Sequence, residues 1–229
     1  MNNDDPLVQA EKLETAATPH DLTLWGTQSI RALRAHWMLT EMNLPYEFVP
    51  VRPRVDSGTP EFRVMNPRSK VPVLRHKDFL LTESAAIVHY LANTFPTPVG
   101  LYSPRGPLES ARLDEWSYFI MTELDATALY VIRRHTDLKH LFGDSPVVVD
   151  SARNYFKAQI EAMRSQIGGL SNYLMGDEFS AVDILMATTL DWAESVGITL
   201  PDEVRVYHRR TVERPAYRAA RACTFTFNG

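Results

Sequence analysis

Cysteine is almost absent from this chain of 229 residues, in which Cys223 is the only one. A single thiol cannot form a disulfide within the chain or hold a cysteine-based metal cluster, and it fits a reducing compartment. Long apolar runs are also missing: no stretch approaches about 18 consecutive apolar residues, so no membrane-spanning helix is predicted. Segment 1–20 is acidic and lacks the basic and apolar parts of a secretion signal, and we therefore expect a cytoplasmic protein.

A basic excess is missing too, because 24 lysines and arginines face 28 acidic residues and the net charge is −4. This balance argues against nucleic acid as a partner. The seven histidines show no metal-ligand spacing, and we predict no metal site. With 45% hydrophobic and 23% charged residues, the composition is that of a globular protein with one large domain or two small ones.

The first third of the chain alternates strand and helix signals. "LTLWG" (22–26) predicts a strand, "SIRALRAHWMLTEMN" (29–43) a helix and "YEFVPV" (46–51) a second strand, which together favour parallel pairing with a right-handed crossover. "KVPVLRHKDFLL" (70–81) predicts a hairpin, and "TESAAIVHYLANTF" (82–95) a further helix. This β-α-β, β-β-α order resembles a thioredoxin-like domain, a small mixed sheet between helices.

The rest of the chain is predicted to be helical. Segment 96–107 holds four prolines and two glycines and predicts a linker between a thioredoxin-like domain (21–95) and an all-helical domain (108–229), with 1–20 as a mobile tail. Two apolar stripes at helical spacing support the second domain. The first stripe is Leu113, Trp116, Ile120 and Leu124, and the second is Ala152, Phe156, Ile160, Met163, Ile167, Leu170 and Leu174.

The segment "FSAVDI" (179–184) has the features of a helix start. Ser180 is a suitable N-cap, and Asp183 three residues later can return the hydrogen bond to the backbone of Ser180. Phe179 and Ile184 flank the pair as a hydrophobic staple. We interpret this segment as a folding element.

The segment "NPRSKVPVL" (66–74) is a strand signal interrupted by a proline. Pro72 cannot donate a ladder hydrogen bond, so it suits an edge or a break in a strand. Considered with "LWGTQSIRALRAHWMLTEMNLPYEF", "LTESAAIVHYLA" and "SAVD", the segment resembles the corresponding motifs of the cytosolic glutathione S-transferases. The resemblance spans residue 22 to about residue 220 and implies a glutathione co-substrate, a small electrophile and a homodimer.

The resemblance assigns the glutathione-binding residues. It implies a cis Val71–Pro72 bond that presents the backbone of Val71 to glutathione, with Lys70 near the glycyl carboxylate. Glu83 and Ser84 would hold the ammonium and carboxylate of the γ-glutamyl end, where a helix N-terminus favours an anion. Without a ligand, the same residues are explained as a broken edge strand and an ordinary helix start.

The catalytic hydroxyl is expected between the first strand and the first helix. Ser29 stands where similar serine-type enzymes place their thiolate donor, and Thr27 is the second choice. Ser29 also has an ordinary interpretation, as a helix N-cap. The family's usual proline and basic residue nearby are replaced here by Ile30 and Leu33. The segment contains no cysteine, which disfavours a mixed disulfide between enzyme and glutathione.

The resemblance places the electrophile between the two domains. Tyr118, Thr122 and Glu123 on the first long helix are candidates for this second-substrate site, and Glu123 is alternatively a contact to glutathione across a dimer.

Two alternatives to a transferase remain open. One is another glutathione-dependent enzyme, such as a dehalogenase, an ether-cleaving enzyme or a disulfide reductase. The other is a non-catalytic protein-interaction or regulatory module built on the same fold.

Replacing Ser180 by alanine is expected to lower the free energy of unfolding by about 1 kcal/mol, because the first turn of its helix loses a cap. Denaturant unfolding measures this change. A loss of ligand affinity per folded molecule, with unchanged stability, would contradict the folding interpretation.

Overall fold

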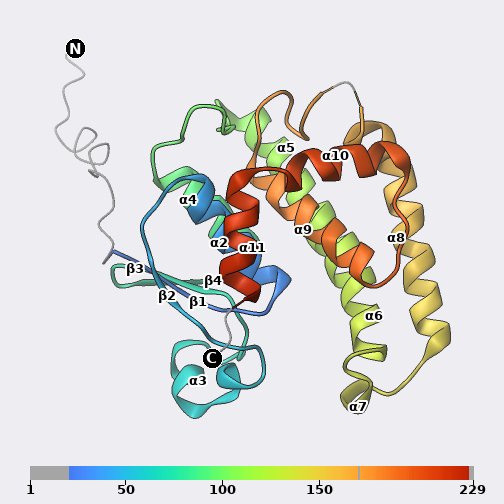
Figure 1. The fold of residues 1–229 in the computed structure, drawn as a ribbon, viewed down its shortest axis with the longest axis horizontal. Helices are drawn as coiled ribbons and strands as arrows, with labels where there is room; N and C mark the ends of the chain where they lie inside the picture. The colour runs from blue at the N-terminus through green and yellow to red at the C-terminus, as the bar shows by residue number, and fades with distance from the viewer. Residues whose placement is uncertain (1–20, 170, 227–229) are drawn as a thin grey trace.

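A four-stranded sheet forms the first part of the computed structural model, which describes residues 21–169 and 171–226. The strands are β1 (Leu22–Trp25), β2 (Glu47–Val49), β3 (Val73–His76) and β4 (Phe79–Thr82), in the order β2-β1-β3-β4 (Figure 1). β1 pairs parallel with β2, whereas the β1–β3 and β3–β4 pairs are antiparallel. The predicted strand–helix–strand unit and the predicted hairpin are both confirmed. The predicted tail, 1–20, lies outside the described residues.

The two faces of the sheet pack against different helices. Leu24 and its β3 partner Leu74 belong to the main core together with residues of α2 (Ile30–Glu41) and α4 (Ser84–Thr94). Val73, the next residue along β3, instead packs in a smaller cluster with Phe62. Because successive side chains of a strand point to opposite faces, this alternation follows directly from the sequence.

The smaller cluster involves a short helix that follows β2. A 3₁₀ turn, η2 (Asp56–Gly58), leads into α3 (Pro60–Met65), which contributes Phe62. The sheet therefore lies between α2 and α4 on one side and α3 on the other, as expected for a thioredoxin-like domain.

The second part of the chain is helical. Its elements are α5 (Pro107–Tyr118), the π-helical segment η3 (Phe119–Leu129), α6 (Tyr130–His135), α7 (Lys139–Phe142), α8 (Pro146–Ile167), α9 (Ala181–Ser195), α10 (Asp202–Val212) and α11 (Pro215–Phe225). α5, η3 and α6 follow one another without a break.

The structure tests both predicted apolar stripes. All four residues of the first stripe are buried, which confirms it. In the second stripe, the members from Ala152 to Ile167 are buried or partly buried, but the helix ends at Ile167. The expectation that Leu174 continues this helix is therefore wrong, since Gly168 ends α8 at its C-cap. Leu170 lies outside the described residues.

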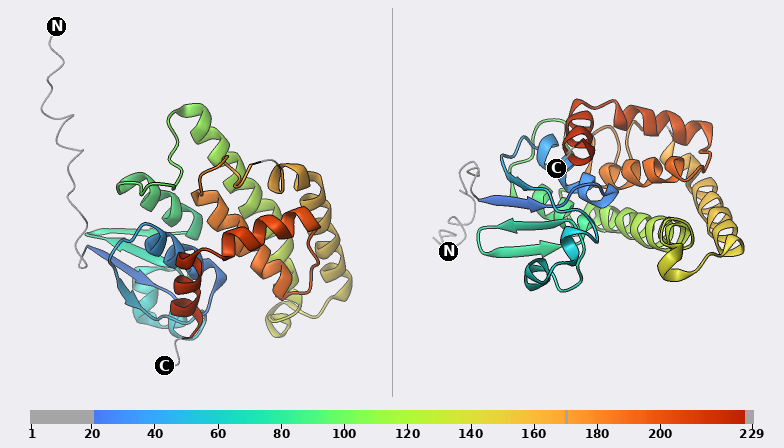
Figure 2. Two further views of the ribbon diagram at one scale, coloured as in Figure 1. Left: turned by 45° about the horizontal axis from the view of Figure 1, so that its top comes forward. Right: turned by 60° about the horizontal axis from the view of Figure 1, so that its bottom comes forward.

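The two parts of the chain share one continuous core. Buried residues of β1, α2 and α4 belong to the same cluster as residues of α8, α9 and α10. Figure 2 shows that α11, the last helix, returns from the helical part to lie beside α2. In the described residues, no helix is both long and apolar enough to cross a membrane. The domain limits at 95 and 108 stay predictions.

The predicted capping box at the start of α9 is present and extends further than expected. Asp183 Oδ2 accepts the backbone N–H of Ser180 at 2.9 Å. Its other oxygen accepts the N–H of Leu174 at 2.9 Å and the hydroxyl of Tyr207 at 2.7 Å. Burial raises the pKa of Asp183, although these hydrogen bonds oppose the shift. One carboxylate therefore joins the start of α9 to α10 and to the chain before it.

Replacing Asp183 by alanine should lower the free energy of unfolding by about 3 kcal/mol, because it leaves several buried donors without an acceptor. The loss should exceed that of Ser180→Ala, and urea unfolding of both variants measures it. Asp177→Ala, at an exposed position nearby, is the matched control and should change stability by no more than about 0.5 kcal/mol. Equal stability of Asp183→Ala and the wild type would contradict the assignment.

Candidate functional site

Ser29 lies at the start of α2, between two hollows of the surface. It is the N-cap residue of α2, with extended backbone angles, but its side chain makes no capping hydrogen bond. It is half-buried. The hydroxyl therefore makes no hydrogen bond to the first turn of α2 and can donate to a ligand.

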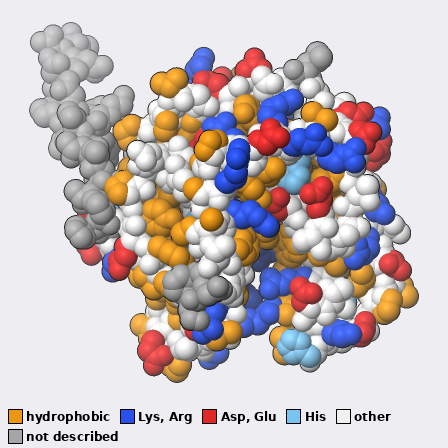
Figure 3. Space-filling model, viewed as in Figure 1, with side chains coloured by type: hydrophobic (Ala, Val, Ile, Leu, Met, Phe, Trp, Pro, Cys, Tyr) orange, Lys and Arg blue, Asp and Glu red, His pale blue; other side chains and the backbone are white. Residues whose placement is uncertain are grey.

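The two hollows have different walls. The first contains Lys70 and Val71, and the second is lined by Trp192 and Ser195 of α9 and by Phe225 of α11. Ser29, Arg31 and Arg133 line both hollows. Figure 3 shows a hollow between the sheet and the helical part with basic side chains along it. A larger hollow between α8 and 198–203 includes none of these residues.

Thr27, the second candidate for the thiolate donor, has a different environment. It is fully buried, and its hydroxyl donates to the carbonyl of Thr224 in α11 at 2.7 Å. The backbone N–H of Gln28 donates to the same carbonyl at 2.9 Å. This geometry gives Thr27 a structural role and favours Ser29 as the hydroxyl that a ligand meets.

His36 holds the chain just before Thr27. Its Nε2 lies 3.0 Å from the carbonyl oxygen of Gly26, and its Nδ1 lies 2.8 Å from the hydroxyl of Tyr46. A neutral ring satisfies both contacts when Nε2 donates to the carbonyl and Nδ1 accepts from the phenol. Burial lowers the pKa of His36 to about 4, although the hydrogen bond to Gly26 opposes the shift.

The Val71–Pro72 peptide bond is cis, as the resemblance implies. Within the described part of the chain, neither the N–H nor the C=O of Val71 makes a hydrogen bond. The preceding loop is held by Asn66, whose side chain donates to the carbonyl of Lys70 at 2.8 Å and accepts the N–H of Arg68 at 3.2 Å. The loop thus leaves the backbone groups of Val71 available to a peptide.

Glu83 and Ser84 lie at the N-terminus of α4 but face different surroundings. Glu83 has a positive φ of 71° and is exposed, and its Oε1 lies 2.7 Å from Nη1 of Arg68. Ser84 is buried, and its Oγ accepts a hydrogen bond from Nη1 of Arg34 at 3.2 Å. The first backbone N–H groups of α4 have no partners within the helix, which suits an anion.

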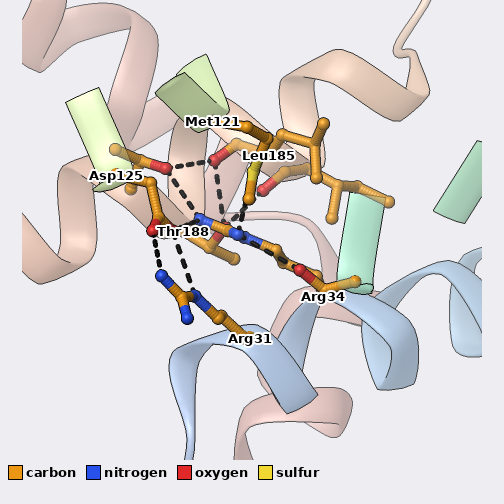
Figure 4. Close-up of polar contacts among 9 residues, drawn as sticks. Arg31, Arg34, Met121, Asp125, Leu185 and Thr188 are labelled. Atoms are coloured by element: carbon orange, nitrogen blue, oxygen red, sulfur yellow. Dashed lines mark hydrogen bonds and ion pairs between the residues drawn. The ribbon is translucent and has the colours of Figure 1, made fainter. Parts of the chain in front are cut away.

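Arg34 is the centre of a buried polar network (Figure 4). It is fully buried and donates to Asp125 of η3 at 2.9 Å and to both Thr188 and Thr189 of α9 at 2.9 Å. Arg31 binds the same carboxylate. Burial would raise the pKa of Asp125, but the two arginines outweigh it and hold that pKa below its ordinary value. Two cations therefore share one anion beside Ser29.

Tyr130 faces the cations of the first hollow. The guanidinium carbons of Arg31 and Arg134 each lie 5.0 Å from the centre of its ring. Partial burial would raise the pKa of Tyr130, but Lys70, Arg31 and Arg134 together lower it. Tyr130 thus lies among several positive side chains.

The predicted second-substrate residues do not line either hollow beside Ser29. Tyr118 is 66% exposed, Thr122 donates to the carbonyl of Tyr118 at 2.8 Å, and Glu123 accepts from the hydroxyl of Tyr155. The continuous helix instead brings Tyr130 and Arg133, seven or more residues later, to the hollows. A contact of Glu123 across a dimer stays a prediction.

Sequence reasoning missed four residues of the site: Arg31, Arg34, Tyr130 and Arg133. For Arg31 and Arg34 the available signal was their spacing of three residues in the helix that follows Ser29, which puts them on one helix face. No local pattern marks Tyr130 or Arg133. Among the described residues there is no group of three or more histidine, cysteine or acidic side chains that could hold a metal.

Two family models match separate parts of this chain. The family model described as "Glutathione S-transferase, N-terminal domain" matches residues 20–93, and that described as "Glutathione S-transferase, C-terminal domain" matches residues 133–220. Glutathione S-transferase GstA of Escherichia coli is 28% identical over 195 residues, which cover 82% of this chain and 92% of that protein.

Solved structures agree on the fold. A glutathione transferase of Methylococcus capsulatus superposes with a TM-score of 0.74 at 27% identity, covering 89% of this chain and 98% of the other. The theta class enzyme of Xanthomonas axonopodis pv. citri, solved with glutathione bound, has a TM-score of 0.74 at 23% identity and coverages of 89% and 97%.

His36 predicts a pH dependence of stability. Its folded pKa of about 4 lies below the ordinary value of 6.5, so the unfolded chain binds more protons between these two values. Stability should therefore fall as the pH drops through this window, by about 2 to 3 kcal/mol for this residue at about pH 4.5.

The measurement is urea unfolding of the wild type and of His36→Gln at neutral and acidic pH. Glutamine keeps one donor and one acceptor but does not titrate, so the variant should lose that much less stability on acidification. Equal losses in both proteins would contradict the prediction.

Proposed function

The chain belongs to the glutathione S-transferase family, and on that premise we propose that it binds glutathione beside Ser29 and activates its thiol towards a small electrophile. The observation that carries this proposal is that Ser29, Lys70 and Val71 line one hollow. A hydroxyl donor, a cation and a free stretch of backbone are the groups that a short thiol peptide with a terminal carboxylate requires.

The backbone of Val71 is the anchor for the peptide part of the ligand. Its N–H and C=O make no hydrogen bonds in the described structure and can pair with an extended peptide as an added strand would. Lys70 beside it is exposed and supplies charge for the glycyl carboxylate. These groups fit the central and glycyl parts of glutathione.

Ser84 and the first N–H groups of α4 fit the carboxylate of the γ-glutamyl end. The oxygen of Ser84 already accepts from Arg34, so its own proton is directed to another acceptor. Arg34 also brings a buried positive charge behind this hydroxyl. Glu83 supplies negative charge for the ligand's ammonium group, which would share it with Arg68.

Ser29 is the proposed donor to the sulfur. A free thiol has a pKa near 8.5, so only about 3% of it is ionised at pH 7. A hydroxyl that donates to the sulfur and lies at a helix N-terminus, with cations close by, favours the thiolate. Bound glutathione would supply the nucleophile, and the chain would orient it and stabilise its charge.

Pairing of two copies is part of the proposal. β4 is an edge strand of the sheet, and Phe79 and Leu80 on it are 50% and 43% exposed. Exposed apolar groups on a sheet edge are a surface that an interface would cover.

Titration of the ultraviolet absorbance of bound thiolate tests the catalytic assignment. The wild type should lower the pKa of the thiol by about 2 units, and Ser29→Ala should return at least half of that shift while glutathione affinity by calorimetry changes less than about threefold. Ser110→Ala, an exposed serine of α5, is the matched control and should behave like the wild type.

Two outcomes would contradict the proposal in different ways. A low thiol pKa that survives Ser29→Ala removes Ser29 as the donor. Absence of binding at millimolar glutathione removes the enzymatic function and leaves the interaction module.

A further inference from the structure

The hollows beside Ser29 contain more positive charge than glutathione requires. Arg31, Arg54, Lys70 and Arg133 line the first hollow, and none of its lining residues is acidic. In the proposed site, Lys70 and Arg54 pair with the glycyl carboxylate. Ser29 and Arg31 stabilise the thiolate. No charged group of glutathione is then left to pair with Arg133.

Arg133 is in an unfavourable position in the free protein. Within the described residues it has no ion pair, and it is half-buried. Burial and the charge of Arg54 lower its pKa, and Arg31 acts in the same direction, whereas Asp137 and Tyr130 oppose them. A cation held among other cations is destabilising until an anion joins them.

The buried network does not remove this charge. Arg31 and Arg34 share the single carboxylate of Asp125, so the three groups together stay positive. Asp137 lines the second hollow and opposes the lowering of the pKa of Arg133, but it is a single exposed carboxylate near Arg31, Arg54 and Arg133. A net positive charge therefore remains at the boundary between the two hollows, where Ser29 lies.

The second hollow combines apolar and polar walls. Ile30, Trp192 and Phe225 form part of its wall, and Arg31 and Arg133 lie on the side shared with the first hollow. A ligand that reacts at the sulfur beside Ser29 would place an apolar part against these side chains and an acidic group against Arg133.

We infer that the second substrate is an anionic electrophile, whose carboxylate or similar acidic group binds Arg133 at the boundary of the two hollows. The inference rests on the proposed glutathione site and names the class of acceptor that the site selects. Arg133 is the specificity-determining residue, and Arg31, which also lines both hollows, contributes further positive charge.

Two glutathione conjugates that differ in one charge test the inference. S-carboxymethylglutathione carries a carboxylate where S-carbamoylmethylglutathione carries an amide of similar size, and calorimetry measures the affinity of each. The wild type should bind the carboxylate about tenfold more tightly, as expected for one charge-assisted hydrogen-bonded pair. Arg133→Gln should reduce this ratio to near one, and Arg133→Lys should retain most of it.

Matched measurements separate the inference from general effects. Arg63→Gln, an exposed arginine of α3, removes the same charge away from the hollows and should keep the ratio. Thermal unfolding should show Arg133→Gln at least as stable as the wild type, because the substitution relieves repulsion among cations.

Equal affinity of the wild type for both conjugates would overturn the inference and leave the glutathione site intact. If Arg133→Gln keeps the wild-type preference for the carboxylate conjugate over the amide conjugate, the role of Arg133 is overturned. If neither conjugate nor glutathione binds, the proposed function itself fails, and the inference fails with it.

Discussion

The buried guanidinium of Arg34 is the constraint on which the arrangement of the site depends. A single side chain of α2 donates hydrogen bonds to α4, η3 and α9, through Ser84, Asp125 and the Thr188–Thr189 pair. A fully buried cation is costly unless it is paired and its donors are satisfied. The sheet-containing part and the helical part of the chain must therefore meet in one relative position, in which all these acceptors converge.

The relative position of the two parts of the chain also determines the surroundings of Ser29. Arg31, two residues after Ser29, binds the same carboxylate as Arg34 and anchors the first turn of α2 to η3. On its other side, the chain before Ser29 is tied to α11 by Thr27 and to α2 by His36. The hydroxyl of Ser29 is left between two hollows because its neighbours on both sides are bound to the helical part.

Charge is distributed unevenly over this site. The whole chain is acidic, with a net charge of −4, yet the residues that line the first hollow carry only positive charge. A local field of this kind is created by tertiary proximity, because Arg31, Lys70 and Arg133 come from three separate segments. A chain whose overall composition argues against nucleic acid thus has a locally positive hollow.

The sequence by itself determined the strands and helices, and the resemblance of its motifs named the candidate binding residues. The spacing of apolar residues predicted the strands and helices, because the side chains that share one face of a strand or helix recur at a fixed local interval. The motifs around Val71 and Ser84 contain the residues that form their own turn and helix start. Only the tertiary structure decided which hydroxyl is available, since Thr27 is buried against Thr224, almost two hundred residues later. The same holds for Tyr130 and Arg133: their neighbours lie far away in the sequence, and no local pattern records which side chains meet across a domain interface.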